Sequence, residues 1–437
     1  MKRVFGRIIL CVTSLATVVS CSGNFDSTSE SGNTKVLTYM PQSNGSYGFH
    51  PFVLVGVDDL KAVAGRFVNF MVAPRIIKQD GREIMSGPSP SARYVKSGDG
   101  TYVASDNFTL ELFTIYAHMQ RLAALDDELG AKGVNKWPRD IGVAVRVEGG
   151  LENNAQYYGP ADAMFFVRYT KSNLPIAVNA GVLAHEHFHS LFYKLVKMTQ
   201  PVRSSVHSLA ELTKNTDAPV KIEEDDGIDF KVDTEPTENA AIKRDANEVY
   251  LRGLNEGFAD FWGWMYTGDP DFVALSLPIA KERTLKVDGR QTDIPFAIET
   301  VKTRLSSLKE ECADFASTQV KDCYDQYKLG FAYEVGTRYA RLLKVFTEKI
   351  AQERKIENLE ARKFVAKTLL KVLPKIDENN LGADVVVQLL ARNTEGLKSS
   401  ECEYLASVVN VISDKPWSCE ENKVDTENSF FTLSESK

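Results

Sequence analysis

The order of hydrophobic and polar positions changes period along the first half of the chain. Up to about residue 100, short apolar pieces alternate with turn clusters such as QSNGSYG and SGPSPS, which is typical of strands joined by loops. Apolar residues then recur at spacings of three and four over residues 108–122. Asp106 or Asn107 is the candidate cap and Gly130 the stop, which predicts a helix. Further strands are expected at 141–147 and 163–169, directly before a second helix.

The second half is mostly helical by the same criterion. Residues 201–247 are polar, acidic and contain proline, so they predict a long surface insertion. Beyond Asn247, apolar residues recur at helical steps, as in FAYEVGTRYARLLKVFTEKI. The expected fold class is α+β. A mixed β-sheet lobe at 36–200 ends in a histidine-bearing helix, and a mainly helical lobe follows at 248–437.

The first 20 residues are predicted to be a secretory signal. Three basic residues precede an apolar run that ends at Val19 and is too short to span a bilayer permanently. The run ends in VVSC, which resembles the lipobox of bacterial lipoproteins. That resemblance implies cleavage before Cys21 and lipid attachment to it, and Ser22 implies the outer membrane of the cell envelope. An ordinary signal peptide cut nearby is the alternative. Residues 21–35 are polar and are expected to form a flexible tether.

Charge and cysteine content narrow the classes of function. Removing the signal leaves 49 of the 52 basic residues against 59 acidic ones, a net charge of −10. No nucleic-acid partner is therefore expected, and the membrane is contacted only through the N-terminal lipid. Besides Cys11 and Cys21, an even number of cysteines remains, which favours disulfides in an exported chain, with free thiols and other pairings left open. Neighbouring cysteines are expected to pair, Cys312 with Cys323 and Cys402 with Cys419.

Three of the six histidines of the chain lie in the segment HEHFH, residues 185–189. His185 and His189 are four apart, so on a helix they share one face and can reach one metal ion at ~2.0 Å. Glu186 lies beside the first ligand, where it can serve a metal-bound water as general base. The apolar flanks predict a buried helix rather than a surface helix with unrelated histidines. His187 is turned by about 200° and is expected to point into the core.

A catalytic zinc ion requires a third protein ligand and an open fourth position. The segment GLNEGFADFWGWM supplies Glu256 and Asp260, which are four apart on another apolar helix. Glu256 is the expected third ligand, and Asp260 can accept the N–H of a zinc-bound imidazole and fix its tautomer. A solvated carboxylate pair is the alternative for these two residues. The set predicts one catalytic Zn²⁺ ion as cofactor.

HEHFH followed by NEGFAD resembles the gluzincin arrangement of the thermolysin-like zinc metallopeptidases. The resemblance implies a thermolysin-like fold and the hydrolysis of peptide bonds in a peptide or protein substrate. It also matches NNAQYY with the edge strand that binds the substrate backbone in that family. Substrate contacts are therefore implied at Asn154 and Ala155, and a turn asparagine is the alternative for Asn154. The roles implied for the metal site are zinc ligands at His185, His189 and Glu256, the general base at Glu186 and the histidine-orienting group at Asp260.

Two features depart from that family. The stretch between the second histidine and Glu256 is much longer, and no histidine follows His207 to stabilise the oxyanion. Tyr327, Tyr333 or Arg338 can donate in its place, with ordinary helix positions as the alternative. A zinc-binding surface lipoprotein that binds a partner without cleaving it is therefore a second hypothesis. The isolated histidines, for which structural or exposed roles are expected, are His50, His118 and His207.

Overall fold

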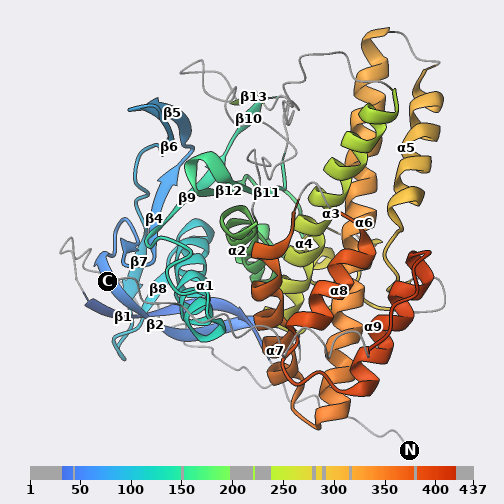
Figure 1. The fold of residues 1–437 in the computed structure, drawn as a ribbon. Helices are drawn as coiled ribbons and strands as arrows, with labels where there is room; N and C mark the ends of the chain where they lie inside the picture. The colour runs from blue at the N-terminus through green and yellow to red at the C-terminus, as the bar shows by residue number, and fades with distance from the viewer. Residues whose placement is uncertain are drawn as a thin grey trace, which may run out of the picture.

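The computed structural model describes residues 32–42, 45–148, 152–196, 220–221, 238–277, 282–287, 292–313, 317–377 and 381–419. The fold is α+β, with strands concentrated in the N-terminal part and a mostly helical C-terminal half (Figure 1). The predicted signal, Cys21, His207 and most of the acidic insertion lie outside the described residues. Among the described residues, none of the helices combines the length and the hydropathy that crossing a membrane requires.

A five-stranded sheet begins the fold. Its order is β3 (Ala64–Gly65), β2 (Tyr47–Asp59), β1 (Gly32–Pro41), β8 (Tyr102–Ala104) and β7 (Tyr94–Lys96). Strand β1 starts at Gly32, and Thr34 is buried, so residues 32–35 belong to the fold and not to the tether. The reason is the antiparallel pairing of this segment with β2, which no apolar pattern before residue 35 indicated.

Helix α1 (Asn107–Leu129) packs against β1 and β2. Its N-cap is Asp106, whose carboxylate accepts the N–H of Thr109 at 2.7 Å, and Gly130 ends the helix in the left-handed region at φ 89°. Both limits agree with the sequence prediction.

A second, four-stranded sheet precedes the histidine-bearing helix. Its order is β11 (Ala155–Tyr158), β12 (Ala163–Val167), β9 (Arg139–Val145) and β4 (Val68–Val72). Strands β12, β9 and β4 are parallel, whereas β11 is antiparallel to β12 and lies at the edge of this sheet. The hairpin of β5 (Arg75–Gln79) and β6 (Arg82–Ser86) packs on it through Ile76 and Met85. A short parallel pair joins β10 (Val147–Glu148) to β13 (Val220–Lys221).

The helical half is built around two long helices that pack against each other, α3 (Glu238–Thr267) and α6 (Ser317–Arg354). Residues 238–247 belong to α3, whereas the sequence prediction placed them in the insertion loop. Ile242, Ala246 and Val249 are buried at steps of four and three, a helical period that the acidic composition obscured. The remaining helices are α4 (Phe272–Ser276), α5 (Ile298–Cys312), α7 (Asn358–Val372), α8 (Ala383–Asn393) and α9 (Ser399–Ile412).

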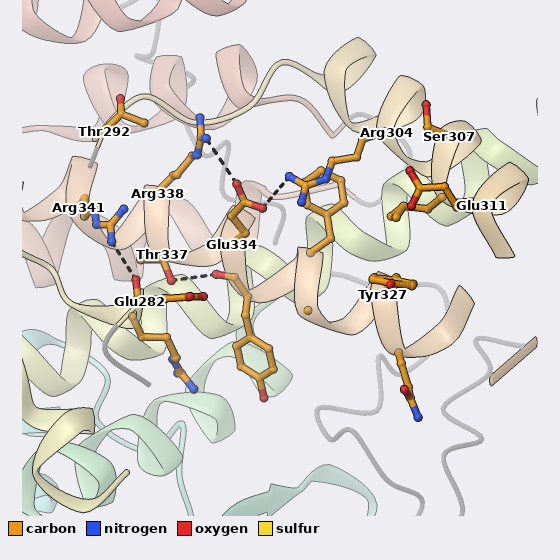
Figure 2. Close-up of a pocket in the computed structure, with 16 residues that line it drawn as sticks. Glu282, Thr292, Arg304, Ser307, Glu311, Tyr327, Glu334, Thr337, Arg338 and Arg341 are labelled. Atoms are coloured by element: carbon orange, nitrogen blue, oxygen red, sulfur yellow. Dashed lines mark hydrogen bonds and ion pairs between the residues drawn. The ribbon is translucent and has the colours of Figure 1, made fainter. Parts of the chain in front are cut away.

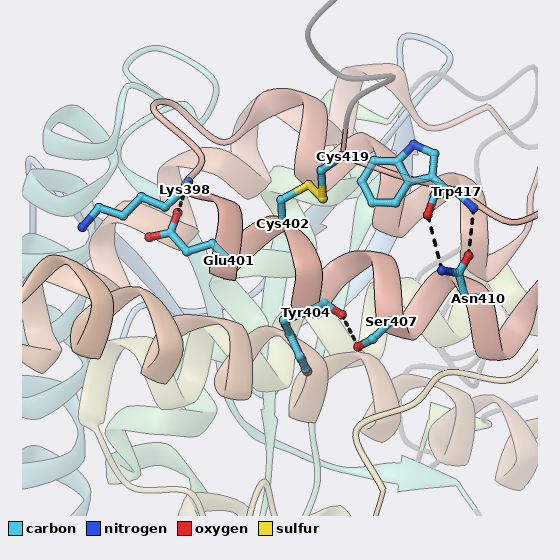
Figure 3. Close-up of a disulfide and its surroundings, with 8 residues drawn as sticks. All are labelled: Lys398, Glu401, Cys402, Tyr404, Ser407, Asn410, Trp417 and Cys419. Carbon is cyan, nitrogen blue, oxygen red and sulfur yellow. Dashed lines mark hydrogen bonds between the residues drawn. A yellow bond between two sulfur atoms is a disulfide. The ribbon is translucent and has the colours of Figure 1, made fainter.

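Two disulfides lie in the helical half, and both join neighbouring cysteines. Cys312 bonds to Cys323, which links α5 to α6, and Cys402 bonds to Cys419. Near the second bond, Asn410 accepts the backbone N–H of Trp417 at 2.8 Å and donates to its carbonyl at 3.3 Å (Figure 3). The segment after α9 is thereby held against that helix.

Candidate metal centre

Helix α2 (Ala180–Leu195) carries the HEHFH segment, and its first turn is fixed by Asn179. The Asn179 Oδ1 accepts the N–H groups of Gly181 and Val182, which are otherwise unpaired at a helix N-terminus. Its Nδ2 donates to the carbonyl of Phe272 and to Ser276 Oγ, both at 2.8 Å. Asn179 therefore ties the start of α2 to α4 and sets the orientation of the histidines further along the helix.

The structure brings His185, His189 and Glu256 together between α2 and α3. The two imidazole Nε2 atoms lie 3.0 Å apart. Glu256 Oε2 lies 3.4 Å from His185 Nε2, and Glu256 Oε1 lies 3.8 Å from His189 Nε2. Ligands at ~2.05 Å in tetrahedral zinc geometry are separated by about 3.3 Å, so these three separations fit the coordination of one ion. The group can hold a metal ion.

The outer nitrogen of each imidazole faces an oxygen. His185 Nδ1 lies 3.0 Å from Asp260 Oδ1, and His189 Nδ1 lies 2.9 Å from Asn255 Oδ1. An oxygen acceptor at Nδ1 favours a proton on that nitrogen and leaves a lone pair on Nε2. The two lone pairs then point at each other and at the Glu256 carboxylate inside a buried site. Such an arrangement is repulsive unless a proton or a cation lies between them.

Burial and the charges of neighbouring groups shift the pKa values of His185, His189 and Glu256. Burial lowers the pKa of His185, but its hydrogen bonds to Asp260 and Glu256 outweigh burial and raise the pKa to about 10. Burial and the neighbouring positive charge of His185 lower the pKa of His189 to about 4. Burial opposes ionisation of Glu256, yet the charges of His189 and His185 hold its pKa down, at about 2. At neutral pH His185 is therefore protonated and His189 is neutral, and the same three side chains can hold a metal ion.

Arg283 belongs to the site, and the sequence prediction missed it. Its guanidinium donates to both carboxylate oxygens of Asp260, at 2.6 and 3.1 Å, and lies 3.4 Å from Glu256 Oε2. It also lies over the Tyr333 ring, 4.7 Å from the centroid. Arg283 lies in a short 3-10 segment at 282–283, so no hydrophobic periodicity marked it. Asn255 was also unassigned, although it directly precedes Glu256.

Glu186 is buried and lies between the metal ligands and strand β11. It is hydrogen-bonded to the backbone N–H of Tyr157, and its Oε2 has no partner among the described residues. Burial is the main cause that raises the pKa of Glu186 to about 7. A buried carboxylate oxygen without a partner is costly, so Glu186 Oε2 is a candidate position for binding a water or a substrate group.

A cavity of about 80 Å³ connects these groups. Asn154 and Ala155 line it together with Glu186, and Ala155 is the first residue of the edge strand β11. The Asn154 carbonyl accepts the N–H of Val167 at 2.9 Å, which continues the pairing with β12 on the inner side. The fold thus places Asn154 and Ala155 in the lining of the same cavity as the predicted base.

The three candidate oxyanion donors differ in position. Tyr333 lines the metal cavity, as Asn154 and Ala155 do. Tyr327 and Arg338 do not, and Tyr327 is 53% exposed. They lie one or two helical turns away along α6, so the sequence alone could not separate them. Burial raises the pKa of Tyr333 well above its usual range, so this hydroxyl keeps its proton and can donate.

The other histidines lie away from the centre. His187 Nε2 lies 2.9 Å from Asp126 Oδ1, and its ring stacks on Trp137, so it points into the core as the spacing predicts. His118 is buried with Nδ1 2.8 Å from the Tyr266 hydroxyl. His50 is exposed on β2.

Comparison with known proteins adds no assignment, because no protein-family model matches the chain and no curated protein matches its sequence. The function is therefore argued from the chemistry of the site.

Proposed function

We propose that the protein is a zinc-dependent peptidase with His185, His189 and Glu256 as zinc ligands and Glu186 as general base. One observation carries the proposal. Two imidazole Nε2 atoms face each other and a carboxylate, with their outer nitrogens held by oxygens, next to a buried carboxylate oxygen without a partner among the described residues. This is a donor set of the type that zinc prefers. It also resembles the gluzincin arrangement inferred from HEHFH and NEGFAD.

The chemistry divides among the residues that line the cavity. When bound, zinc lowers the pKa of a coordinated water to about 7 and polarises a carbonyl oxygen. Glu186 accepts the proton of the attacking water and returns it to the leaving amine. The edge strand β11 can hold an extended peptide through its backbone at Asn154 and Ala155. Tyr333 and Arg283 also line the cavity and can donate to the developing oxyanion.

The proposal includes a location. The VVSC segment suggests that Cys21 carries lipid and anchors the chain in a bacterial cell envelope, with the outer membrane indicated by Ser22. The substrates are then peptides or proteins that reach the periplasmic or surface side of that membrane.

A cleavage assay tests the proposal. The mature chain is loaded with zinc and offered a broad peptide library, alongside Glu186→Gln and a matched control, Glu360→Gln, on the exposed side of α7. Removal of a general base is expected to lower kcat/KM by roughly 10²–10⁴-fold, while the control keeps full activity.

Two outcomes contradict the proposal. Equal cleavage by the wild type and Glu186→Gln, at full zinc occupancy, would rule out Glu186 as the base. A protein that binds zinc and cleaves nothing in the library would favour the second hypothesis, a lipoprotein that binds a partner.

A further inference from the structure

A second, larger cavity adjoins the metal cavity. It has a volume of about 690 Å³ and lies along α5 and α6, with residues of the 282–283 turn and Thr292 completing its wall (Figure 2). Arg283 and Tyr333 line both cavities, so the two spaces adjoin at these two side chains beside the metal centre. A peptide bound at the centre can therefore extend into the larger cavity.

Two arginines inside this cavity converge on one carboxylate. Arg304 of α5 donates to Glu334 Oε2 at 2.6 Å, and Arg338 lies 3.5 Å from Glu334 Oε1. Figure 2 shows Glu334 between the two guanidinium groups. Two positive charges thus share one negative charge at this point, although each guanidinium can bind a carboxylate with two parallel N–H donors.

Stacking holds both guanidinium groups in place. Arg304 lies over the Phe331 ring at 4.3 Å from its centroid, and Arg338 lies over the Phe296 ring at 3.5 Å. A stacked guanidinium keeps its in-plane N–H donors directed sideways, where they can bind a planar carboxylate. The arginines are therefore ordered before any ligand arrives.

The other charged residues that line the cavity are two arginines bonded to other groups and two glutamates. Arg341 donates to the backbone carbonyls of Glu282 and Thr284, and Arg283 is paired with Asp260. Figure 2 shows Glu282 and Glu311 on either side of Glu334, and the dashed lines to Arg304 and Arg338 come from Glu334. The local excess of positive charge is therefore at Arg304 and Arg338.

We infer that this cavity is a subsite for a carboxylate of the substrate, which Arg304 and Arg338 bind in competition with Glu334. The inference rests on the proposed peptidase function, which it deepens by naming acidic peptides as the substrate class. Arg338 follows Tyr333 by five residues, about 7.5 Å along α6. That length corresponds to roughly two residues of extended peptide, so the carboxylate lies two or three residues from the bond at the metal.

Paired peptides test the subsite. Library peptides that differ only in Glu or Gln at the second or third residue on either side of the cleaved bond are compared, all with amidated C-termini. A further pair carries Gln and differs in a free or amidated C-terminus, which separates a side-chain carboxylate from a terminal one. The wild type is expected to prefer the carboxylate member of at least one pair by about tenfold in kcat/KM.

Three variants connect that preference to the cavity. Arg304→Gln combined with Arg338→Gln should reduce the ratio to about one, and Glu334→Gln should raise it, because the competing carboxylate is gone. Arg392→Gln, on the exposed surface of α8, is the control for loss of one positive charge and should leave the ratio unchanged.

Binding to Glu186→Gln separates failure of the subsite from failure of the peptidase proposal. The same fluorescently labelled pairs are titrated into this variant and followed by anisotropy, a readout that needs no cleavage. A carboxylate preference in binding that disappears in the Arg304/Arg338 double variant supports the subsite, even if the wild type cleaves nothing. Equal affinity for both members of every pair, or a preference that survives the double variant, overturns it.

Discussion

At the scale of residues, two oxygen atoms orient the histidines of the candidate metal centre. Asn255 Oδ1 and Asp260 Oδ1 each lie within 3.0 Å of the outer nitrogen of one histidine, and Arg283 donates to the carboxylate of Asp260. Groups that orient metal-binding imidazoles in this way usually contribute 10–100-fold to metal affinity. Neither Asn255 nor Arg283 is a proposed metal ligand, yet both are expected to affect the affinity for the metal ion.

Replacement of Asn255 tests that role. Asn255→Ala removes the acceptor that favours the Nδ1–H tautomer of His189, so zinc affinity is expected to fall by roughly 10–100-fold. The dissociation constant is measured by competition with a chelator, with Asn393→Ala on α8 as the control. Unchanged affinity in Asn255→Ala, with the fold intact by circular dichroism, would show that His189 needs no such orientation.

His118 is expected to make stability depend on pH. Burial lowers its pKa to about 3 in the folded protein, whereas an unfolded histidine titrates near 6.5. Below pH 6.5 the unfolded chain therefore binds a proton that the folded chain does not, so stability falls as the pH falls toward 3. Between pH 7 and 5.5 this residue should cost about 1 kcal/mol of the free energy of unfolding.

Denaturant unfolding at several pH values measures this effect as a difference between two proteins. His118→Gln should have a shallower loss of stability in acid than the wild type, because it lacks the titrating group. Parallel curves for the two proteins would contradict the assignment. The metal ligands also titrate, but they are common to both proteins and cancel in the difference.

For individual residues, the sequence predicts the positions that follow from regular spacing along a helix. Two histidines four apart and two carboxylates four apart share a helix face, so the placement of His185, His189, Glu256 and Asp260 follows from helix geometry. Arg283 lies in a short turn without periodicity, and only the tertiary fold brings it to Asp260. For the same reason, spacing along α6 could not show which tyrosine of that helix lines the centre.

At the scale of elements, the centre depends on how closely α3 packs on its neighbours. Helix α3 packs against α2 on one side and α6 on the other, and it carries Glu256 and Asp260. Its contact with α6 is close enough that a Cβ on Gly257 would lie 2.1 Å from the Gly336 carbonyl oxygen. Glycine is therefore required there, directly after the proposed metal ligand Glu256.

Two glycine substitutions should have opposite effects. Gly257→Ala forces α3 and α6 apart and is expected to destabilise the zinc-free protein by about 2 kcal/mol or more. Gly330→Ala, on α6 where an added Cβ meets nothing within 4 Å, should stabilise it by about 0.5–1 kcal/mol through helix propensity. Both are measured by denaturant unfolding. Equal effects of the two substitutions would refute the proposed close contact.

Element limits could be predicted where local signals were strong. Asp106 and Gly130 define both ends of α1 in the sequence and in the structure. The starts of β1 and α3 were missed for two reasons: β1 begins with polar residues that pair with β2, and the acidic composition before Asn247 obscured the helical spacing of Ile242, Ala246 and Val249. Local composition dominated the sequence prediction at both places.

The whole molecule assembles the centre from both halves of the chain. The edge strand β11 and helix α2 come from the N-terminal part, whereas Glu256, Arg283 and Tyr333 come from the helical half. The site therefore exists only when the halves are packed together. A metal ion that binds this folded state and not the unfolded chain should stabilise the whole protein.

The most direct test of the account is a calorimetric titration of the zinc-free mature chain with Zn²⁺. One ion per chain is expected to bind with high affinity, and that binding should be lost when His185→Ala and Glu256→Ala are combined. Absence of saturable binding, or equal binding to the double variant, would contradict a metal centre at His185, His189 and Glu256.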